Sequence, residues 1–159
     1  MESEEPINKH FLYPGTIFAE PSPCQISTVL GSCVAVCLWD KVLRIGGMNH
    51  IMLPLWNGEG LATPKYGNIA MDKLFAKITA IGCRRENLVA KVFGGANVTG
   101  TGLELFMIGD RNLTVTYKML EEFRIPVVAD DIGGRVGRKI IMNSETGVVM
   151  VGKGRKIQG

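Results

Sequence analysis

The sequence predicts one α+β domain, built from short strands and two main helices. Three runs rich in apolar and β-branched residues, at 24–30, 33–39 and 88–93, are typical of strands. Residues 64–81 instead place apolar side chains at helical spacing. Glycine pairs and prolines separate these elements, and no internal repeat is present. A chain of 159 residues can bury one core and is too short for two typical domains.

The N-terminal segment differs in composition from the rest of the chain. Its first residues, MESEEPINKH, are polar and acidic and contain no apolar run that could join a core. We therefore expect residues 1–10 to form a disordered tail and residues 11–159 to form the single folded domain.

The run 33–39 predicts how the layers are arranged. Cys33, Ala35, Cys37 and Trp39 alternate with three further apolar residues, so both faces of this strand are apolar. A strand that is apolar on both faces is covered on both faces. We expect a largely antiparallel sheet with helices on one face and a second layer of sheet on the other.

Turn and cap residues divide the rest of the chain. Asp40 suits the first position of a turn, so residues 44–53 are predicted to return as a strand that Pro54 ends. Thr63 can cap the first helix, with Pro64 in its first turn. The remaining predicted elements are a strand at 88–93, a second helix from about 111 to 123, a strand at 127–130 and a hairpin around 143–147.

Charge and composition exclude several classes of function. The net charge is +3, from 18 basic and 15 acidic residues, and no basic stripe indicates a nucleic-acid binder. The longest apolar stretch, 34–39, is too short to span a bilayer. No signal peptide is recognisable, so we expect a cytoplasmic protein without membrane insertion, whose cysteines are reduced. The four cysteines include no C-x-x-C pair and have no histidine ligand partners, so neither a metal nor another cofactor is expected.

Cys33 and His50 form the constellation that could carry chemistry. If the turn between their strands centres between Lys41 and Val42, opposed residues have numbers that sum to 83, as 33 and 50 do. The thiol and the imidazole would then share one face, with Cβ atoms about 4.5–5.5 Å apart. An imidazole can take the proton of a thiol, hold the thiolate as an ion pair, and later protonate a leaving amine.

Each of these residues also has a purely structural interpretation. A cysteine in an apolar strand is usually a small buried hydrophobe, and a lone strand histidine is more often structural than catalytic. The Gly94-Gly95-Ala96 segment lacks the lysine of a phosphate loop and is typical of a turn that supports a cleft. Arg111 and Asn112 are interpreted as capping or surface residues, with contact to substrate as the alternative.

A third group should orient the imidazole. No carboxylate is obviously near on the predicted sheet. Ser27 and Thr28, on the strand before Cys33, could offer a hydroxyl or a carbonyl.

The motifs surrounding Cys33 and His50 resemble those of the CheD family, the chemoreceptor glutamine deamidases of bacterial and archaeal chemotaxis. The resemblance covers about residues 13 to 152. It is carried by LGSCVAVCLWD, GGMNHIMLP, KYGNIAMDKL, AKVFGGAN, IGDRN and DIGGRVGRKIIMNSETG, in this order. The resemblance implies an α/β/β layered sandwich similar to the catalytic domain of cytotoxic necrotizing factor toxins.

The resemblance also implies the site residues. Cys33 falls on the family's catalytic cysteine and His50 on its catalytic histidine. The family's third catalytic residue is a threonine six positions before the cysteine, where this chain has Ser27. Serine keeps the hydroxyl and loses the methyl group. The residues next to these three are expected to contact the substrate: Thr28, Gly31, Ser32 and Asn49.

The implied activity is that of a protein-glutamine glutaminase. It would convert glutamines of methyl-accepting chemotaxis receptors to glutamate through a Cys33 thioester, and it could also hydrolyse receptor glutamyl methyl esters. The alternative is a binding module that acts as the partner of a CheC-type phosphatase. A thiol redox protein is disfavoured by the missing C-x-x-C pair.

Overall fold

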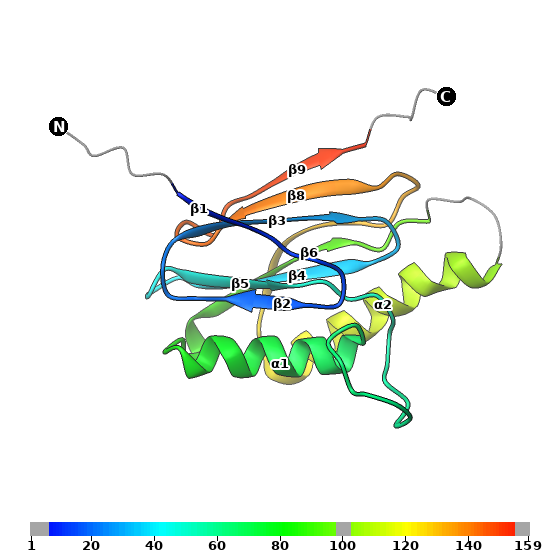
Figure 1. Cartoon of the computed structure of the whole chain (residues 1–159), viewed down its shortest axis with the longest axis horizontal. Helices are drawn as coiled ribbons and strands as arrows, with labels where there is room; N and C mark the ends of the chain where they lie inside the picture. Colours follow the sequence, from blue (N-terminus) through cyan, green and yellow to red (C-terminus); the bar gives the residue numbers. More distant parts are fainter. Residues whose placement is uncertain (1–6, 98–102, 155–159) are drawn as a thin grey trace.

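The chain folds into three layers, a pair of helices and two β-sheets stacked on one another (Figure 1). The computed structural model describes residues 7–97 and 103–154. Within them lie nine strands, the helices α1 (Gly67–Ala80) and α2 (Leu103–Phe123), and the short 3₁₀ turn η1 (Arg85–Asn87). The predicted α+β class, the two helices and the second layer of sheet are confirmed.

The inner sheet lies between the helices and the outer sheet (Figure 1). Its strands, in spatial order, are β2 (Ile17–Ala19), β5 (Ile45–Asn49), β4 (Val34–Asp40), β6 (Leu88–Gly94) and β7 (Val127–Ile132). The outer sheet has the order β1 (Asn8–Phe11), β3 (Cys24–Leu30), β8 (Arg138–Asn143) and β9 (Val149–Lys153). Strand pairs β1–β3 and β6–β7 are parallel and the other pairings are antiparallel, so both sheets are mixed.

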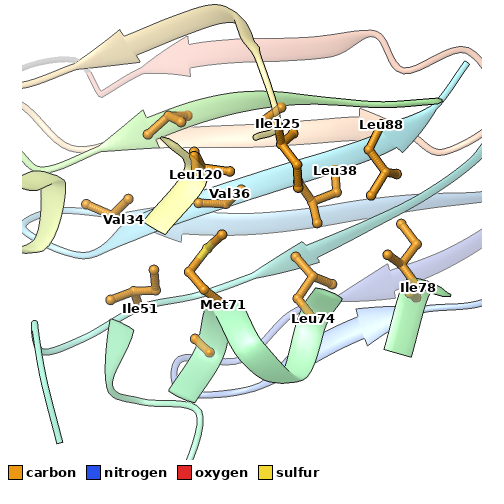
Figure 2. Packing of buried hydrophobic residues seen from close by; sticks show 14 of the residues in the cluster. Val34, Val36, Leu38, Ile51, Met71, Leu74, Ile78, Leu88, Leu120 and Ile125 are labelled. Atoms are coloured by element: carbon orange, nitrogen blue, oxygen red, sulfur yellow. The ribbon is translucent and has the colours of Figure 1, made fainter. Parts of the chain in front are cut away.

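Strand β4 is buried on both faces, as its composition predicted. Val34, Val36 and Leu38 point to the helices. Figure 2 shows Met71, Leu74 and Ile78 of α1 packed against this face, with Leu120 and Ile125 beside them. On the opposite face Ala35 and Cys37 join a second apolar cluster, which fills the space between the two sheets. Burial on two sides fixes β4 rigidly, and the candidate nucleophile stands directly before it.

Both helices begin elsewhere than the sequence predicted. Helix α1 starts at Gly67 with Tyr66 as its N-cap, and Thr63 is not the cap. The carbonyl of Lys65 instead accepts hydrogen bonds from the backbone of Met52 and Leu53, which holds the preceding segment out of the helix. Helix α2 starts eight residues earlier than expected, at Leu103.

The N-terminal prediction was wrong for residues 8–10. Together with Phe11 they form β1, which pairs in parallel with β3 from Asn8 opposite Cys24 to Phe11 opposite Ser27. The segment is polar because β1 is an edge strand whose side chains are largely exposed, so hydrophobic patterning gave no signal. The first six residues of the predicted tail lie outside the described part of the chain.

The turn between β4 and β5 sets the register on which the site depends. Asp40 accepts the backbone N–H groups of Val42 and Leu43 at Oδ1, and Arg44 N donates to the Asp40 carbonyl at 2.8 Å. Arg44 takes a left-handed φ of 59°. The loop therefore holds four residues, and opposed residues pair as 37 with 48 and 38 with 47, a sum of 85. The predicted sum of 83 was wrong by two residues.

No helix within the described ranges has both the length and the apolar character needed to cross a bilayer.

We predict that Asp40→Ala lowers the free energy of unfolding by about 3 kcal/mol, because three backbone N–H groups lose a buried carboxylate acceptor. Besides the two turn N–H groups, the N–H of Arg84 donates to Oδ2 at 3.1 Å, and Asp40 itself is fully buried. Urea unfolding measures the loss. Asp40→Asn keeps one oxygen acceptor and should lose less; equal stability of Asp40→Ala and the unchanged protein would contradict this role.

Candidate functional site

The segment that carries Cys33 is held by backbone hydrogen bonds to the end of β6. Gly95 N donates to the Cys33 carbonyl at 2.9 Å, and Ala96 N donates to the Gly31 carbonyl at 2.9 Å. Gly94 has a φ of 106°, and a Cβ there would collide with the Cys33 carbonyl oxygen. Only glycine fits this close approach. The Gly94-Gly95-Ala96 segment is therefore a support for Cys33, in line with the turn predicted there.

His50 follows β5 and is held by a buried hydroxyl. Its Nδ1 lies 2.7 Å from Thr28 Oγ1, and that hydroxyl donates to the Leu12 carbonyl at 2.7 Å. A threonine hydroxyl has one hydrogen, and a carbonyl can only accept. Since that hydrogen goes to Leu12, the imidazole must donate from Nδ1 and Thr28 must accept. The neutral ring then keeps its lone pair on Nε2, the nitrogen that a general base requires.

Cys33 and His50 face the same space between the two sheets. Thr28, the partner of His50, belongs to β3 of the outer sheet, and Cys33 packs against the apolar cluster that lies between the sheets. The isolated bridge of Val34 with Ile51 continues the register sum of 85, so Cys33 and His50 are diagonal neighbours. The sequence predicted that the two residues would be directly opposed, and this prediction was wrong. Because the shift is two residues, both side chains keep the same face. Diagonal partners lie about 7–8 Å apart, within reach of a long side chain.

Ser27 does not contact the imidazole. The buried positions of β3 are Cys24, Ile26, Thr28 and Leu30, and Ser27 lies on the alternate, outward face. It lines a shallow depression together with Lys9, Gln25, Lys139 and Ile141. Ser27 was expected to orient the imidazole, but the hydroxyl that contacts it is that of Thr28, one residue along the strand.

The four residues that were expected to contact substrate differ in their exposure. Gly31 and Ser32 are half-buried beside Cys33, as a contact with substrate requires. Thr28 is fully buried and holds His50 instead. Asn49 is also fully buried, and its side chain accepts from Val36 N of β4 and donates to Met71 Sδ of α1. The expectation that Asn49 contacts substrate was wrong.

Asn112 of α2 is a site residue that the sequence did not reveal. Its Nδ2 donates to the carbonyls of Ser32 and Met52, both at 3.2 Å, and its side chain is fully buried. One amide group thus ties the segment before Cys33 to the segment after His50. Asn112 had been interpreted as a capping or surface residue, which is wrong, whereas the neighbouring Arg111 is exposed as expected. Only the tertiary packing of α2 brings Asn112 to these two segments, which the Val34–Ile51 bridge already holds side by side.

Burial favours the uncharged forms of the His50 imidazole and the Cys33 thiol. It lowers the pKa of His50 to about 4 and raises the pKa of the Cys33 thiol above its usual value. The predicted thiolate–imidazolium ion pair is therefore disfavoured in the empty site. The thiol can instead pass its proton to Nε2 as it attacks, which is general-base catalysis. Burial also raises the pKa values of Cys37 and Cys83, to about 12.

The part of the chain that the structure describes contains no candidate metal-binding site. No group of three histidine, cysteine, aspartate or glutamate side chains is arranged there to hold an ion.

Comparison with known proteins identifies close relatives. Residues 52–153 match the family model described as CheD chemotactic sensory transduction. The chain is 62% identical to the probable chemoreceptor glutamine deamidase CheD of Trichlorobacter lovleyi, over 95% of this chain and 94% of the relative. It is 48% identical to the protein of the same name from Sulfurimonas denitrificans, over 90% of this chain and 92% of the relative. The family-model match begins just after His50, but the first alignment spans 151 residues and includes both Cys33 and His50.

We predict that iodoacetamide modifies Cys33 alone in the folded protein. Cys33 is half-buried, whereas Cys24, Cys37 and Cys83 are buried. Intact mass should show one slow addition, slow because burial disfavours the thiolate. Cys33→Ser should show none under the same conditions. Modification of a second cysteine at a similar rate would contradict the buried placement of the other three.

We also predict a loss of stability in acid that depends on His50. The pKa of His50 is lowered from 6.5 to about 4 by burial, so between these values the unfolded chain binds more protons than the folded one. The contribution of His50 to the free energy of unfolding is therefore fully present above pH 6.5. It is lost as the pH falls toward 4, and the loss amounts to about 3 kcal/mol. Urea unfolding of His50→Gln should lack this part of the loss.

The matched control for that measurement is His10→Gln, because His10 is the other histidine of the sequence and its ring stacks on Phe18, whereas the His50 ring bonds Thr28. Identical acid losses in His50→Gln and the unchanged protein would show that the imidazole is not buried as a neutral group.

Proposed function

The chain belongs to the CheD family, and we propose that it deamidates glutamine side chains of methyl-accepting chemotaxis receptors with Cys33 as nucleophile and His50 as base. The observation that carries this proposal is the oriented imidazole. Thr28 accepts from Nδ1 and so leaves Nε2 with its lone pair, in a chain 62% identical to a probable chemoreceptor glutamine deamidase. Among the residues that the structure describes, Cys33 is the cysteine that is only half-buried, and the strand register puts it on the same face as His50.

The first half of the reaction forms a thioester. The Cys33 sulfur attacks the side-chain carbonyl carbon of the glutamine as the thiol proton passes to His50 Nε2. The tetrahedral intermediate collapses when the imidazolium gives that proton to the amide nitrogen, which leaves as ammonia. The imidazolium does not have to be stable, because His50 accepts the proton and returns it within this half-reaction. Thr28 keeps the ring oriented throughout, because its bond to Nδ1 is present in both protonation states.

The second half hydrolyses the thioester. His50 Nε2 takes a proton from a water molecule, whose oxygen attacks the acyl carbon. The carbon–sulfur bond breaks, the sulfur recovers the proton, and glutamate is released. The same groups would also hydrolyse a glutamyl methyl ester, with methanol leaving in place of ammonia.

The activity is tested on a purified cytoplasmic fragment of a chemoreceptor. Each deamidation exchanges NH₂ for OH and adds about one dalton, which intact-mass spectrometry resolves. Cys33→Ala should reduce the rate to the uncatalysed background. Full deamidation by Cys33→Ala would refute the mechanism and would leave the binding-module alternative as the better account of this chain.

A matched pair of variants identifies the third member of the site. Thr28→Val removes the hydroxyl that orients His50 and should lower kcat/KM by roughly 10- to 100-fold. Ser27→Ala removes the hydroxyl on the outward face and should change kcat/KM less than twofold, roughly the limit of the assay. Thr28→Ser, which keeps the hydroxyl, should recover most of the lost rate. The opposite order of effects would favour Ser27.

A further inference from the structure

The outer sheet leaves one of its two faces uncovered. Its other face packs on the inner sheet, and no helix or strand of the described chain lies against the outward one (Figure 1). Residues that pair directly in a sheet point to the same side of it. The pairings therefore place one row of four side chains across the outward side: Phe11, Ser27, Ile141 and Met150. We call this uncovered side of the sheet the outer face.

Apolar side chains occur on all four strands of the outer face. Phe11 of β1 is 42% exposed, Val29 of β3 is 55% exposed and Met150 of β9 is 67% exposed. Ile141 of β8 lies between them and is half-buried. Neighbouring strands are about 4.8 Å apart, so the row spans roughly 14 Å. Apolar side chains that gather on a surface in this way are typical of a contact with another protein.

Two shallow depressions adjoin each other on the outer face. One has a volume of about 290 Å³, and its lining includes the apolar side chains of Val148 and Met150. The other has a volume of about 170 Å³, and Gln25 and Ile141 line both depressions. Each depression is smaller than the pockets of roughly 300–1,000 Å³ that hold small molecules. Each is therefore suited to a single side chain of a docked protein.

The smaller depression is positively charged. Lys9 and Lys139 line it together with Ser27, and both lysines are exposed. Among the described residues neither lysine is paired with a carboxylate. The outward positions of the four strands contain no acidic residue, and Glu145 lies beyond them in the turn after β8. Two unpaired ammonium groups favour a carboxylate on the surface that docks here.

We propose that the outer face is a docking surface for a protein partner, and that its occupant is a segment in which an acidic side chain adjoins an apolar one. The apolar side chain fills the depression beside Met150, and the carboxylate reaches Lys9 and Lys139. A second copy of this chain is disfavoured, because it would bring its own two lysines to the same surface. The inference does not depend on the proposed function, since the outer face is on the opposite side of β3 from the Thr28–His50 bond.

The test follows the backbone amide chemical shifts of the full chain during titration with short synthetic peptides. A peptide rich in leucine and glutamate should shift residues of β1, β3, β8 and β9, with a dissociation constant of about 1 mM or tighter. Peptides rich in leucine and lysine, or in serine and glutamate, should bind at least about tenfold more weakly. Equal binding of the leucine–lysine peptide, or shifts confined to other elements, would overturn the inference.

Two variants locate the contact. Lys139→Glu and Met150→Ser should each weaken binding of the leucine–glutamate peptide by about tenfold, because one reverses a charge and the other removes an apolar contact. The matched controls are Lys73→Glu and Val42→Ser, which change exposed residues of α1 and of the β4–β5 turn. The controls should bind the peptide as the unchanged protein does. Full affinity in both outer-face variants would show that the peptide binds elsewhere.

Two other occupants of the outer face are distinguished by the same measurements. Residues 1–6 include three glutamates and directly precede β1. If the peptide binds only after these residues are removed, the chain itself occupies the outer face and the inference is overturned. Vesicles of phosphatidylglycerol provide the second comparison. If they bind the full chain and lose it in Lys139→Glu, while no peptide binds, the surface recognises lipid and the inference is again overturned.

Discussion

The hydrogen bond from His50 Nδ1 to Thr28 Oγ1 is the interaction on which the site depends. It joins the inner sheet to the outer sheet across a largely apolar layer, alongside the bond from Lys91 to the Gly147 carbonyl and the ion pair of Arg138 with Asp131. A buried polar group without a partner is costly, so the two sheets are favoured in the one arrangement that pairs these groups. The same bond fixes the tautomer, because the only hydroxyl hydrogen is already donated to Leu12. The packing of the two sheets and the proposed proton transfer therefore share this contact.

The nucleophile is positioned by different elements from the base. Gly94 and Gly95 bring the end of β6 against the Cys33 carbonyl, and Asn112 of α2 holds the adjacent Ser32 carbonyl. His50 is instead held by β3 and by the turn that follows β1. Asn112 links the two halves, since its second hydrogen bond goes to Met52, two residues beyond His50. The relative placement of thiol and imidazole thus depends on the packing of all three layers.

Local patterns predicted much of the fold and less of the site. Strand β3 was predicted at its observed ends, and the two apolar faces of β4 correctly indicated a second sheet, because burial leaves a direct mark on composition. The β4–β5 register was missed because Asp40 and the left-handed Arg44 close a four-residue loop that spacing alone does not define. The sequence analysis named Ser27 instead of Thr28, because the choice depends on which face of β3 meets the inner sheet, and the spacing of residues does not show that. Asn112 lies 80 residues from Ser32 in sequence, and no local signal reports such a contact.

Burial weakens the reacting groups in isolation and can still serve catalysis. The pKa of His50 is lowered to about 4 and that of Cys33 is raised, so the neutral thiol is favoured over the reactive thiolate. Such a thiol resists oxidants and non-specific electrophiles, whose attack requires the thiolate. In the proposed reaction a bound glutamine would change the balance, because its carbonyl carbon would take electron density from sulfur as the proton moves to Nε2. The reactivity of Cys33 then depends on a substrate placed at the correct distance, and the orientation imposed by Thr28 determines whether Nε2 can receive the proton at that moment.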